Sequence, residues 1–386
     1  MTRPAARTLH SFCAGMRTVL RRLREDRLLL VLVAALAALG VVARAPVASY
    51  ASLVDWNTIA ALTGLLALTK GLELSSGLHR LGLRLIDAMA TERATALCLV
   101  VVAALLSTAV TNDVALLVVV PLTRSVCRVT KLPATRLIVF EALAVNAGSA
   151  LTPIGNPQNL FLWQLFKVPF GVFVWQMLPL VLLMMAALLV LTACAFPGRA
   201  VQIKLQEKVA DLDVVLLSLS LALYVPFLLA TEFHQSGWAV ACVLLVFAVL
   251  RPKALEQLDW GLLLVLVLMF VDLRLLAGLS GVRDALHHLD LAQPRHLYLS
   301  AIGASQFISN VPAAIALSTY TSDWRVVAYA VTVGGFGFMV GSLANLIALR
   351  LSGDPRAWIQ FHAYAVPFLA LAGALGYALL FGVHTS

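Results

Sequence analysis

Charged residues are scarce in this sequence. Only 12% of its 386 residues are Asp, Glu, Lys or Arg, while 61% are hydrophobic, and the mean hydropathy is +0.94. Soluble domains usually contain about 25% charged and about 45–50% apolar residues, so a soluble fold is excluded. Many apolar runs approach the roughly 20 residues that a helix needs to cross a bilayer. We therefore predict an all-α polytopic membrane protein with about 10–11 transmembrane helices.

Cysteine is also rare, and several cofactor motifs are missing. The five cysteines are Cys13, Cys98, Cys127, Cys194 and Cys242. No two of them have the close spacing of a metal or redox pair, so they are interpreted as packing residues. The sequence has no His-Glu-x-x-His zinc pair, no P-loop and no dinucleotide fingerprint. We predict no cofactor and no permanent metal, and we expect an ion gradient, rather than ATP bound by this chain, to supply energy.

Basic residues exceed acidic ones, 28 against 19, which gives a net charge of +9. Seven arginines precede the first apolar run, and this places residues 1–27 in the cytoplasm by the positive-inside rule. With the spans assigned along the chain, 22 basic residues fall inside and five outside, and Arg274 lies near a membrane face. The charge is therefore a topology signal rather than a nucleic-acid footprint. Residues 28–45 are predicted to be a retained first helix, although a basic start and an apolar run also resemble a signal peptide.

The rest of the chain divides into two halves with the same kinds of break. Residues 53–196 form the predicted first repeat and 213–382 the second, with a cytoplasmic linker at 197–212. A segment with basic residues at both ends should enter and leave the membrane on the same side. We therefore predict a re-entrant helical hairpin at about 94–123 and a corresponding one at about 296–320.

Each half also contains a predicted broken helix, at about 137–165 and about 326–349. Proline and glycine interrupt the first at Thr152-Pro153-Ile154-Gly155-Asn156-Pro157, and glycines interrupt the second. Such breaks survive at membrane depth only where protein or a polar cavity satisfies the backbone. The paired landmarks Asp55 and Asp259, Asn112 and Asn310, and Asn159 and Asn345 are separated by 204, 198 and 186 residues. Because the predicted starting side flips between halves, we predict inverted-topology repeats with sites at the midplane.

The hairpin tips and the run Thr152-Pro153-Ile154-Gly155-Asn156-Pro157-Gln158-Asn159-Leu160 resemble the ArsB/NhaD ion-transporter superfamily. The likeness covers about Asp55 to Arg350 and is greatest to its uncharacterised anion permease branch. Relatives move arsenite, dicarboxylates, citrate, sulfate or sodium, and the resemblance implies a homodimer in the bacterial inner membrane. Dicarboxylate members have Ser-Asn-Thr at both tips, whereas this chain has Thr111-Asn112-Asp113 and Ser309-Asn310-Val311, which argues against dicarboxylates.

The candidate binding residues occupy the tips and the breaks. An Asn at a helix start can cap the helix or bind substrate there, and polar breaks can offer oxygens to Na⁺ or simply pack helices together. The predicted substrate- or ion-binding set is Thr111, Asn112, Asp113, Thr152, Gly155, Asn156, Asn159, Ser309, Asn310, Gly341, Ser342 and Asn345. Transient Na⁺ binding is expected at Asn112, Asn156, Asn310 and Asn345.

Acidic residues inside the membrane are costly, at about 2.5–3.5 kcal/mol each on insertion scales, and are usually functional. A buried carboxyl group can hold a proton, so Asp113 and Glu141 are candidates for proton coupling. Glu141 has an alternative, which is to extend to the cytoplasmic face. Asp272 and Arg274 are interpreted as an interfacial pair, and Asp55 and Asp259 as helix-start residues.

These features predict a secondary active transporter, not an enzyme. Its substrate is expected to be a small anion, an inorganic oxyanion or a carboxylate, coupled to H⁺ or Na⁺ by alternating access. The alternative is a Na⁺/H⁺ antiporter, because helix starts favour anions whereas an ionised Asp113 favours a cation. A remote alternative is an intramembrane enzyme, since Gly278-Leu279-Ser280-Gly281 matches a rhomboid-type pattern, but no histidine lies on a neighbouring span.

Overall fold

The computed structural model describes residues 27–44, 46–87, 89–130, 132–200 and 211–382. These residues are almost entirely helical and contain no β-sheet, only an isolated bridge between Thr91 and Ala200. The predicted all-α class is confirmed. The N-terminal region 1–26, with Cys13 and most of the N-terminal arginines, and most of the 197–212 linker lie outside the described residues.

The helices of the first half and the segment before it are α2 (Arg27–Ala43), η1 (Val47–Leu53), α3 (Trp56–Leu74), α4 (Gly77–Asp87), α5 (Glu92–Ala109), α6 (Asn112–Thr130), α7 (Ala134–Ser149), α8 (Pro157–Phe166) and α9 (Phe170–Ala195). The second half contains α10 (Val214–Glu232), α11 (Ser236–Leu250), α12 (Pro252–Glu256), α13 (Trp260–Gly278), α14 (Ser280–His287), α15 (Pro294–Ile308), α16 (Asn310–Leu317), η2 (Ser318–Tyr320), α17 (Trp324–Gly334), η3 (Met339–Gly341), α18 (Leu343–Ser352) and α19 (Ala357–Phe381).

Side-chain caps explain why several helices begin where they do. The Asp55 carboxylate accepts a hydrogen bond from the backbone N–H of Thr58 at the start of α3, and Asp259 accepts one from Leu262 at the start of α13. Each cap satisfies one of the backbone donors that a helix start leaves unpaired. The interpretation of both aspartates as helix-start residues is therefore confirmed.

Five described helices are long and apolar enough to cross a membrane: α5, α9, α10, α13 and α19. Counting the bent pair formed by α2 and η1 as one span makes up to six. Large apolar side chains on these helices face outward; Trp175 of α9, for example, is 72% exposed. A surface of this kind is stable only in contact with lipid or another protein. The chain is an integral membrane protein, while the expected total of about 10–11 spans stays a prediction.

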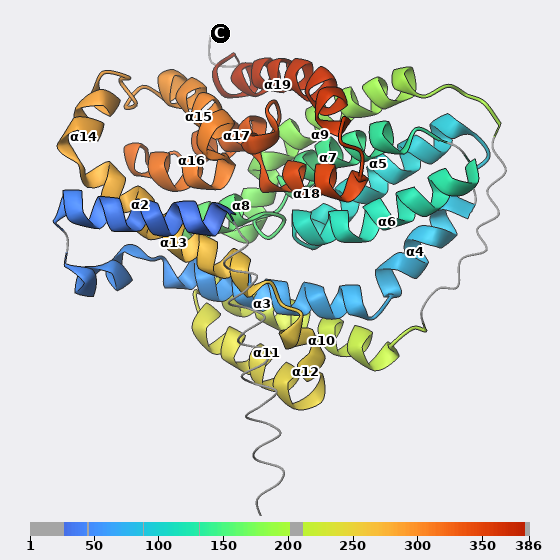
Figure 1. Ribbon diagram of the computed structural model, residues 1–386, viewed down its shortest axis with the longest axis horizontal. Helices are drawn as coiled ribbons and strands as arrows, with labels where there is room; N and C mark the ends of the chain where they lie inside the picture. The colour runs from blue at the N-terminus through green and yellow to red at the C-terminus, as the bar shows by residue number, and fades with distance from the viewer. Residues whose placement is uncertain (1–26, 45, 88, 131, 201–210, 383–386) are drawn as a thin grey trace, which may run out of the picture.

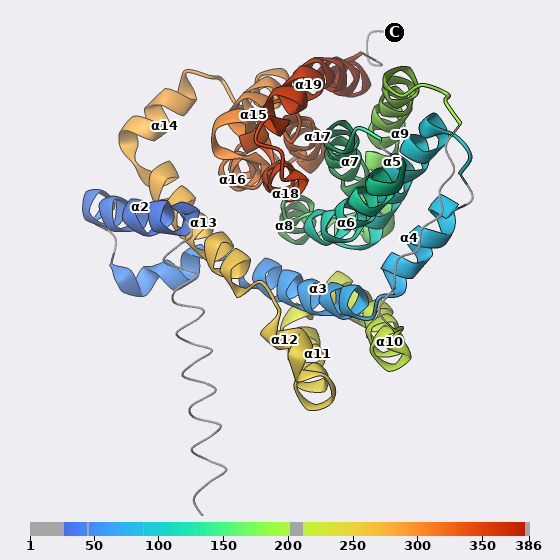
Figure 2. The same ribbon diagram turned by 45° about the vertical axis from the view of Figure 1, so that its right-hand side comes forward.

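The hairpin pairs and broken helices lie together on one side of α3 (Figures 1 and 2). On the other side of α3 are α10, α11 and α12, and α2 runs beside α13 in both views. The first hairpin pair consists of α5 and α6, and its second helix extends to Thr130, through Pro121, rather than ending near residue 123. Proline is tolerated in a membrane helix where neighbouring groups compensate for the missing donor.

Helices begin at corresponding positions in the two halves. The starts of α3 and α13 are 204 residues apart, those of α6 and α16 are 198 apart, and those of α8 and α18 are 186 apart. These separations equal the offsets between the sequence landmarks. They support two equivalent halves, and the opposite membrane orientation of the halves stays a prediction.

Candidate functional site

The first hairpin tip lies between α5 and α6 and is anchored to the break in the neighbouring helix. The backbone N–H of Asn112 donates to the carbonyl oxygen of Gly155 at 2.9 Å. The side-chain oxygen of Asn112 accepts from the backbone N–H of Asp113 at 3.0 Å. Two oxygens at this tip, Thr111 Oγ1 and Asp113 Oδ1, are buried without a hydrogen-bond partner among the described residues. The tip therefore retains free acceptors for a ligand.

The second tip is a single residue, Ser309, between α15 and α16. Its backbone has φ 73° and ψ 159°, a region that residues with a side chain rarely adopt. Such backbone costs of the order of 1–3 kcal/mol and persists only where the surroundings enforce it. Asn310, which begins α16, is 3% exposed. This strained turn aims the start of α16 at the same region as the first tip.

The second limb of each broken helix follows a polar residue, and in the first half the side chain of that residue caps the helix. Asn156 Oδ1 accepts from the backbone N–H of Asn159 at 2.9 Å, and its amide donates to Ser149 Oγ at 3.1 Å. Ser342 precedes α18 in the equivalent place. The amide of Asn159 donates to the carbonyl oxygens of Ala150 and Thr152. The Asn159 amide thus satisfies two carbonyl groups within the first break, as helix breaks at membrane depth require.

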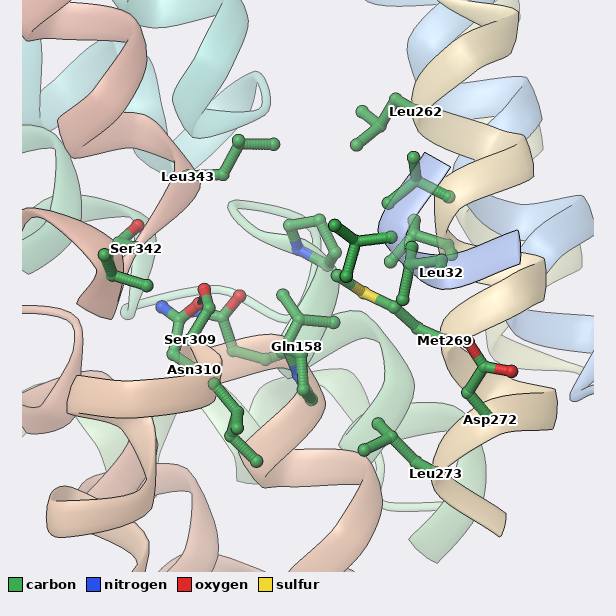
Figure 3. A pocket seen from close by; sticks show the side chains of 18 of the residues that line it. Leu32, Gln158, Leu262, Met269, Asp272, Leu273, Ser309, Asn310, Ser342 and Leu343 are labelled. Carbon is green, nitrogen blue, oxygen red and sulfur yellow. Dashed lines mark hydrogen bonds between the residues drawn. The ribbon is translucent and has the colours of Figure 1, made fainter. Parts of the chain in front are cut away.

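A cavity of about 390 Å³ lies where the four helix starts converge. Its polar end consists of Asn112 and Asp113 from α6, Gln158 from α8, Ser309 and Asn310 at the start of α16, and Ser342 before α18. Apolar side chains of α2 and α13 form the opposite wall, as Figure 3 shows for Leu32, Leu262 and Met269. Helix starts carry unpaired N–H groups and the positive end of the helix dipole. The site therefore combines four such ends with an apolar wall.

A buried polar cluster joins the two halves beside this cavity. The Asn146 amide donates to Asn345 Oδ1 at 2.7 Å, and Ser342 Oγ donates to Asn146 Oδ1 at 3.0 Å. The Asn345 amide in turn donates to the Gly335 carbonyl oxygen at 2.9 Å. Asn146 belongs to α7, whereas Gly335, Ser342 and Asn345 flank the break between α17 and α18. The cluster therefore holds one broken helix against the other.

The structure divides the predicted binding residues into two groups. Five line the cavity: Asn112, Asp113, Ser309, Asn310 and Ser342. The remaining seven lie in the adjoining tip and breaks, outside the cavity lining: Thr111, Thr152, Gly155, Asn156, Asn159, Gly341 and Asn345. Their roles in binding, including transient Na⁺ binding, stay predictions.

Three polar residues of this region were not in the predicted binding set: Asn146, Gln158 and Asp272. Gln158 follows Pro157 in the motif Thr152–Leu160. Because proline is common in the first turn of a helix, this position indicated that Gln158 lies at a helix start. Asn146 lies in the last turn of α7, among apolar residues just before the break, and only its contacts reveal its role. Asp272 lines the cavity from α13.

The two acidic alternatives are resolved by burial and contacts. Glu141 is 0% exposed, so the interpretation that it extends to the cytoplasmic face is wrong. It accepts a hydrogen bond from Thr123 of α6 and lies outside the cavity lining. The interpretation of Asp272 and Arg274 as a pair is also wrong. The Arg274 guanidinium lies 5.9 Å from the centre of the Phe270 ring, and neither Asp272 oxygen has a hydrogen-bond partner among the described residues.

Replacing Thr123 by valine should destabilise the packing of α6 against α7. In the described structure Thr123 is the one hydrogen-bond partner of Glu141, whose second oxygen has none. Leaving a buried polar group unsatisfied costs about 1–3 kcal/mol. Thermal unfolding in detergent would measure this loss. Thr130→Val on the same helix is the control, because Thr130 donates only to the Val126 carbonyl of its own helix. Equal stability of the two variants would contradict the prediction.

Comparison with known proteins agrees with this membrane architecture. The family model of the citrate transporter, CitMHS, matches residues 19–334. The Escherichia coli (strain K12) inner membrane protein YbiR is 46% identical over 363 residues, which cover 94% of this chain and 97% of YbiR. An uncharacterised transporter of Methanocaldococcus jannaschii is 31% identical over 78% of this chain and 82% of its own length. The silicon efflux transporter LSI3 of Oryza sativa subsp. japonica is 34% identical over 96 residues, 25% of this chain and 20% of its own length.

Proposed function

This chain belongs to the citrate transporter family CitMHS, and we propose that it is a secondary active transporter of a small anion coupled to H⁺ or Na⁺. Membership of this family makes it a membrane transporter, and the relatives' names describe transporters or membrane proteins rather than enzymes. Ser280 of the protease-like pattern is exposed at the start of α14. The proposed location is the bacterial cytoplasmic membrane with the N-terminus inside, and the proposed assembly is a homodimer.

The convergence of four helix starts on one cavity carries the proposal for an anion. Backbone N–H groups and the helix dipole make a helix start an anion-binding site, and in transporters broken helices use it for this purpose. Among the described residues that line the cavity there is no Lys or Arg. A weakly charged inorganic oxyanion or a monocarboxylate fits such a site better than a multivalent anion, which would lack a cationic partner in an apolar surrounding.

A Na⁺/H⁺ antiporter is the second candidate, and Asp113 favours it. Its Oδ1 atom is buried without a partner, and the residue lines the cavity. If Asp113 is ionised, it attracts a cation; if it is protonated, the helix starts dominate and an anion binds. We therefore propose that the protonation state of Asp113 decides between the two functions. Glu141 is a further candidate for coupling transport to protons.

The cavity's two walls suggest how access could alternate. The hairpins and broken helices form its polar end, whereas α2 and α13 form its apolar wall. We propose that the first group moves as a transport unit against the second, which stays fixed with α3, α10 and α11. Crosslinks between α13 and the hairpin tips are then expected to arrest transport, and undiminished flux through crosslinked protein would contradict this motion.

Proteoliposomes with an internal pH dye test both functions. The monovalent anions nitrate and lactate and the multivalent anions sulfate and citrate would each be added with and without Na⁺, and Na⁺ and Li⁺ would be added separately without these anions. We expect an anion to evoke a pH change or Na⁺-dependent uptake, reduced at least about tenfold in Asn112→Ala and Asn310→Ala, since loss of about 1.4 kcal/mol of binding is a factor of ten.

Asn57→Ala is the matched control, because Asn57 is exposed on α3 and distant in sequence from either tip. It should transport like the natural sequence. A pH change evoked by Na⁺ or Li⁺ and lost in Asp113→Asn would overturn the anion proposal in favour of the antiporter.

A further inference from the structure

Asp272 is the one polar residue in a stripe of α13 that faces the cavity. The side chains of α13 that line it recur at helical spacing and are Leu262, Val265, Leu266, Met269, Asp272, Leu273 and Leu276. In Figure 3, Asp272 lies on the opposite side of the cavity from Gln158, Asn310 and Ser342, next to Met269 and Leu273. A stripe of this kind normally serves packing, which gives no reason for a carboxyl group at this position.

The Asp272 carboxyl group has no structural task. The residue is 5% exposed, and neither oxygen has a hydrogen-bond partner among the described residues. Six residues separate it from the end of α13 at Gly278, which is about 9 Å at the helical rise. Acidic residues at such depth are rare, and those that occur in transporters mark ion or proton pathways.

Charged groups on the surrounding elements do not compensate for it in the described structure. The neighbouring helix α16 has no ionisable side chain, and Lys70 and Glu73 of α3 pair with each other at 2.6 Å. The basic residues of this segment lie only at the two ends of α2, where Arg27 begins the helix and Arg44 follows it. The ionisable side chain in η1 is Tyr50. The following helix α14 carries Arg283, Asp284 and His287 in its sequence. Among the described residues that line the cavity, the other acidic one is Asp113 at the polar end.

The ligand that fits Asp272 is a proton. A hard cation such as Na⁺ needs several oxygen ligands, and the lining side chains adjacent to Asp272 on α13, Met269, Leu273 and Leu276, offer none. A proton needs only the carboxylate. We propose that Asp272 is the proton-binding site that couples transport to H⁺, facing the substrate end of the cavity from the fixed wall. The coupling role rests on the proposed function, whereas the proton site does not.

The exchange at this site is a simple acid–base equilibrium. The carboxylate takes a proton from water when the cavity is open to one side of the membrane. While the cavity is closed, Asp272 stays protonated and therefore neutral within the apolar wall. The acid returns the proton to water when the cavity opens to the other side. Because α13 belongs to the fixed wall and the tips move, one carboxyl group can serve both openings.

Infrared difference spectroscopy of the protein in liposomes tests the proton site without any substrate. Spectra would be recorded while the buffer is exchanged between acidic and alkaline, in H₂O and in D₂O. We expect a protonated-carboxyl band that titrates, is lost in Asp272→Asn, and shifts but persists in Asp272→Glu. Asp284→Asn is the control, because Asp284 is exposed at the neighbouring helix α14. If all titrating carboxyl bands of Asp272→Asn are the same as those of the natural sequence, the proposal is overturned.

The same liposomes, with an internal pH dye, test the coupling. On addition of nitrate, lactate, sulfate or citrate, the proton movement that the anion evokes should be at least tenfold lower in Asp272→Asn than in the natural sequence, whereas exchange of the labelled anion across the membrane should be retained. Loss of exchange together with proton movement would overturn the coupling role. If no anion evokes a response in the natural sequence while the infrared band depends on Asp272, the proposed function fails and the proton site stands.

Discussion

Replacing Asn146 by alanine is expected to lower the free energy of unfolding by about 2–4 kcal/mol and to abolish transport. The change removes the amide that donates to Asn345 and accepts from Ser342. Both partners are at most 1% exposed, so water cannot replace the lost bonds without opening the packing. Each buried polar group left unsatisfied costs about 1–3 kcal/mol. Because the cluster joins α7 to the second broken helix, its loss also frees the helix starts that form the cavity.

Unfolding monitored by intrinsic fluorescence in detergent, together with uptake in liposomes, measures both effects. Gln360→Leu is the control, because it also removes a side-chain amide, and its Oε1 has no partner among the described residues. This control should not lower stability, because it removes a buried oxygen that has no partner to lose. A stable Asn146→Ala variant with normal uptake would show that the cluster does not hold the two halves together.

Replacing Gly155 by alanine should reduce transport at least about a hundredfold, which corresponds to about 2.7 kcal/mol. An added methyl group would lie 2.3 Å from the Ser149 carbonyl oxygen and 2.7 Å from that of Ser107. Both are backbone atoms, so the break must move away from the first hairpin, at a cost of about 1–3 kcal/mol or more. That movement stretches the bond from the Asn112 N–H to the Gly155 carbonyl and displaces the tip from the cavity.

Gly303→Ala in α15 gives the comparison. A methyl group there meets no atom within 4 Å, and alanine favours helix by about 1 kcal/mol over glycine. This variant should be as stable as the natural sequence or more so, with normal uptake. Equal uptake by Gly155→Ala and Gly303→Ala would mean that the position of the first tip does not matter for transport.

Sequence patterns predicted the fold class and the regions that contain the site. Apolar runs that lack charge have no stable alternative to membrane helices, because unpaired backbone groups are too costly in lipid. Proline and glycine between Thr152 and Asn159 marked a break, and the structure ends α7 at Ser149 and resumes with α8 at Pro157. The end of α6 was not predicted correctly, because Pro121 and the basic residues after it indicated an end near residue 123, whereas the helix continues to Thr130.

The polar residues show where such reasoning reaches its limit. Asn156 and Asn345 have the same amide chemistry as Asn112 and Asn310, and only contacts separate the groups. The side chain of Asn156 caps α8, and that of Asn345 accepts a hydrogen bond from Asn146 in the buried cluster. Asn112 and Asn310 line the cavity. An Asn at a helix start can cap or bind, and the choice depends on which other groups reach it.

The sequence by itself determined that this is a helical membrane transporter with two matching sets of breaks, because hydropathy, basic-residue placement and backbone-breaking residues act locally along the chain. Only the tertiary structure decided which of the polar residues share a cavity, and that Asp272 faces it without a partner while Glu141 is buried against Thr123. The cavity brings together residues more than a hundred positions apart, and even the contact of Glu141 with Thr123, 18 positions away, depends on how two helices pack, which a one-dimensional pattern does not specify.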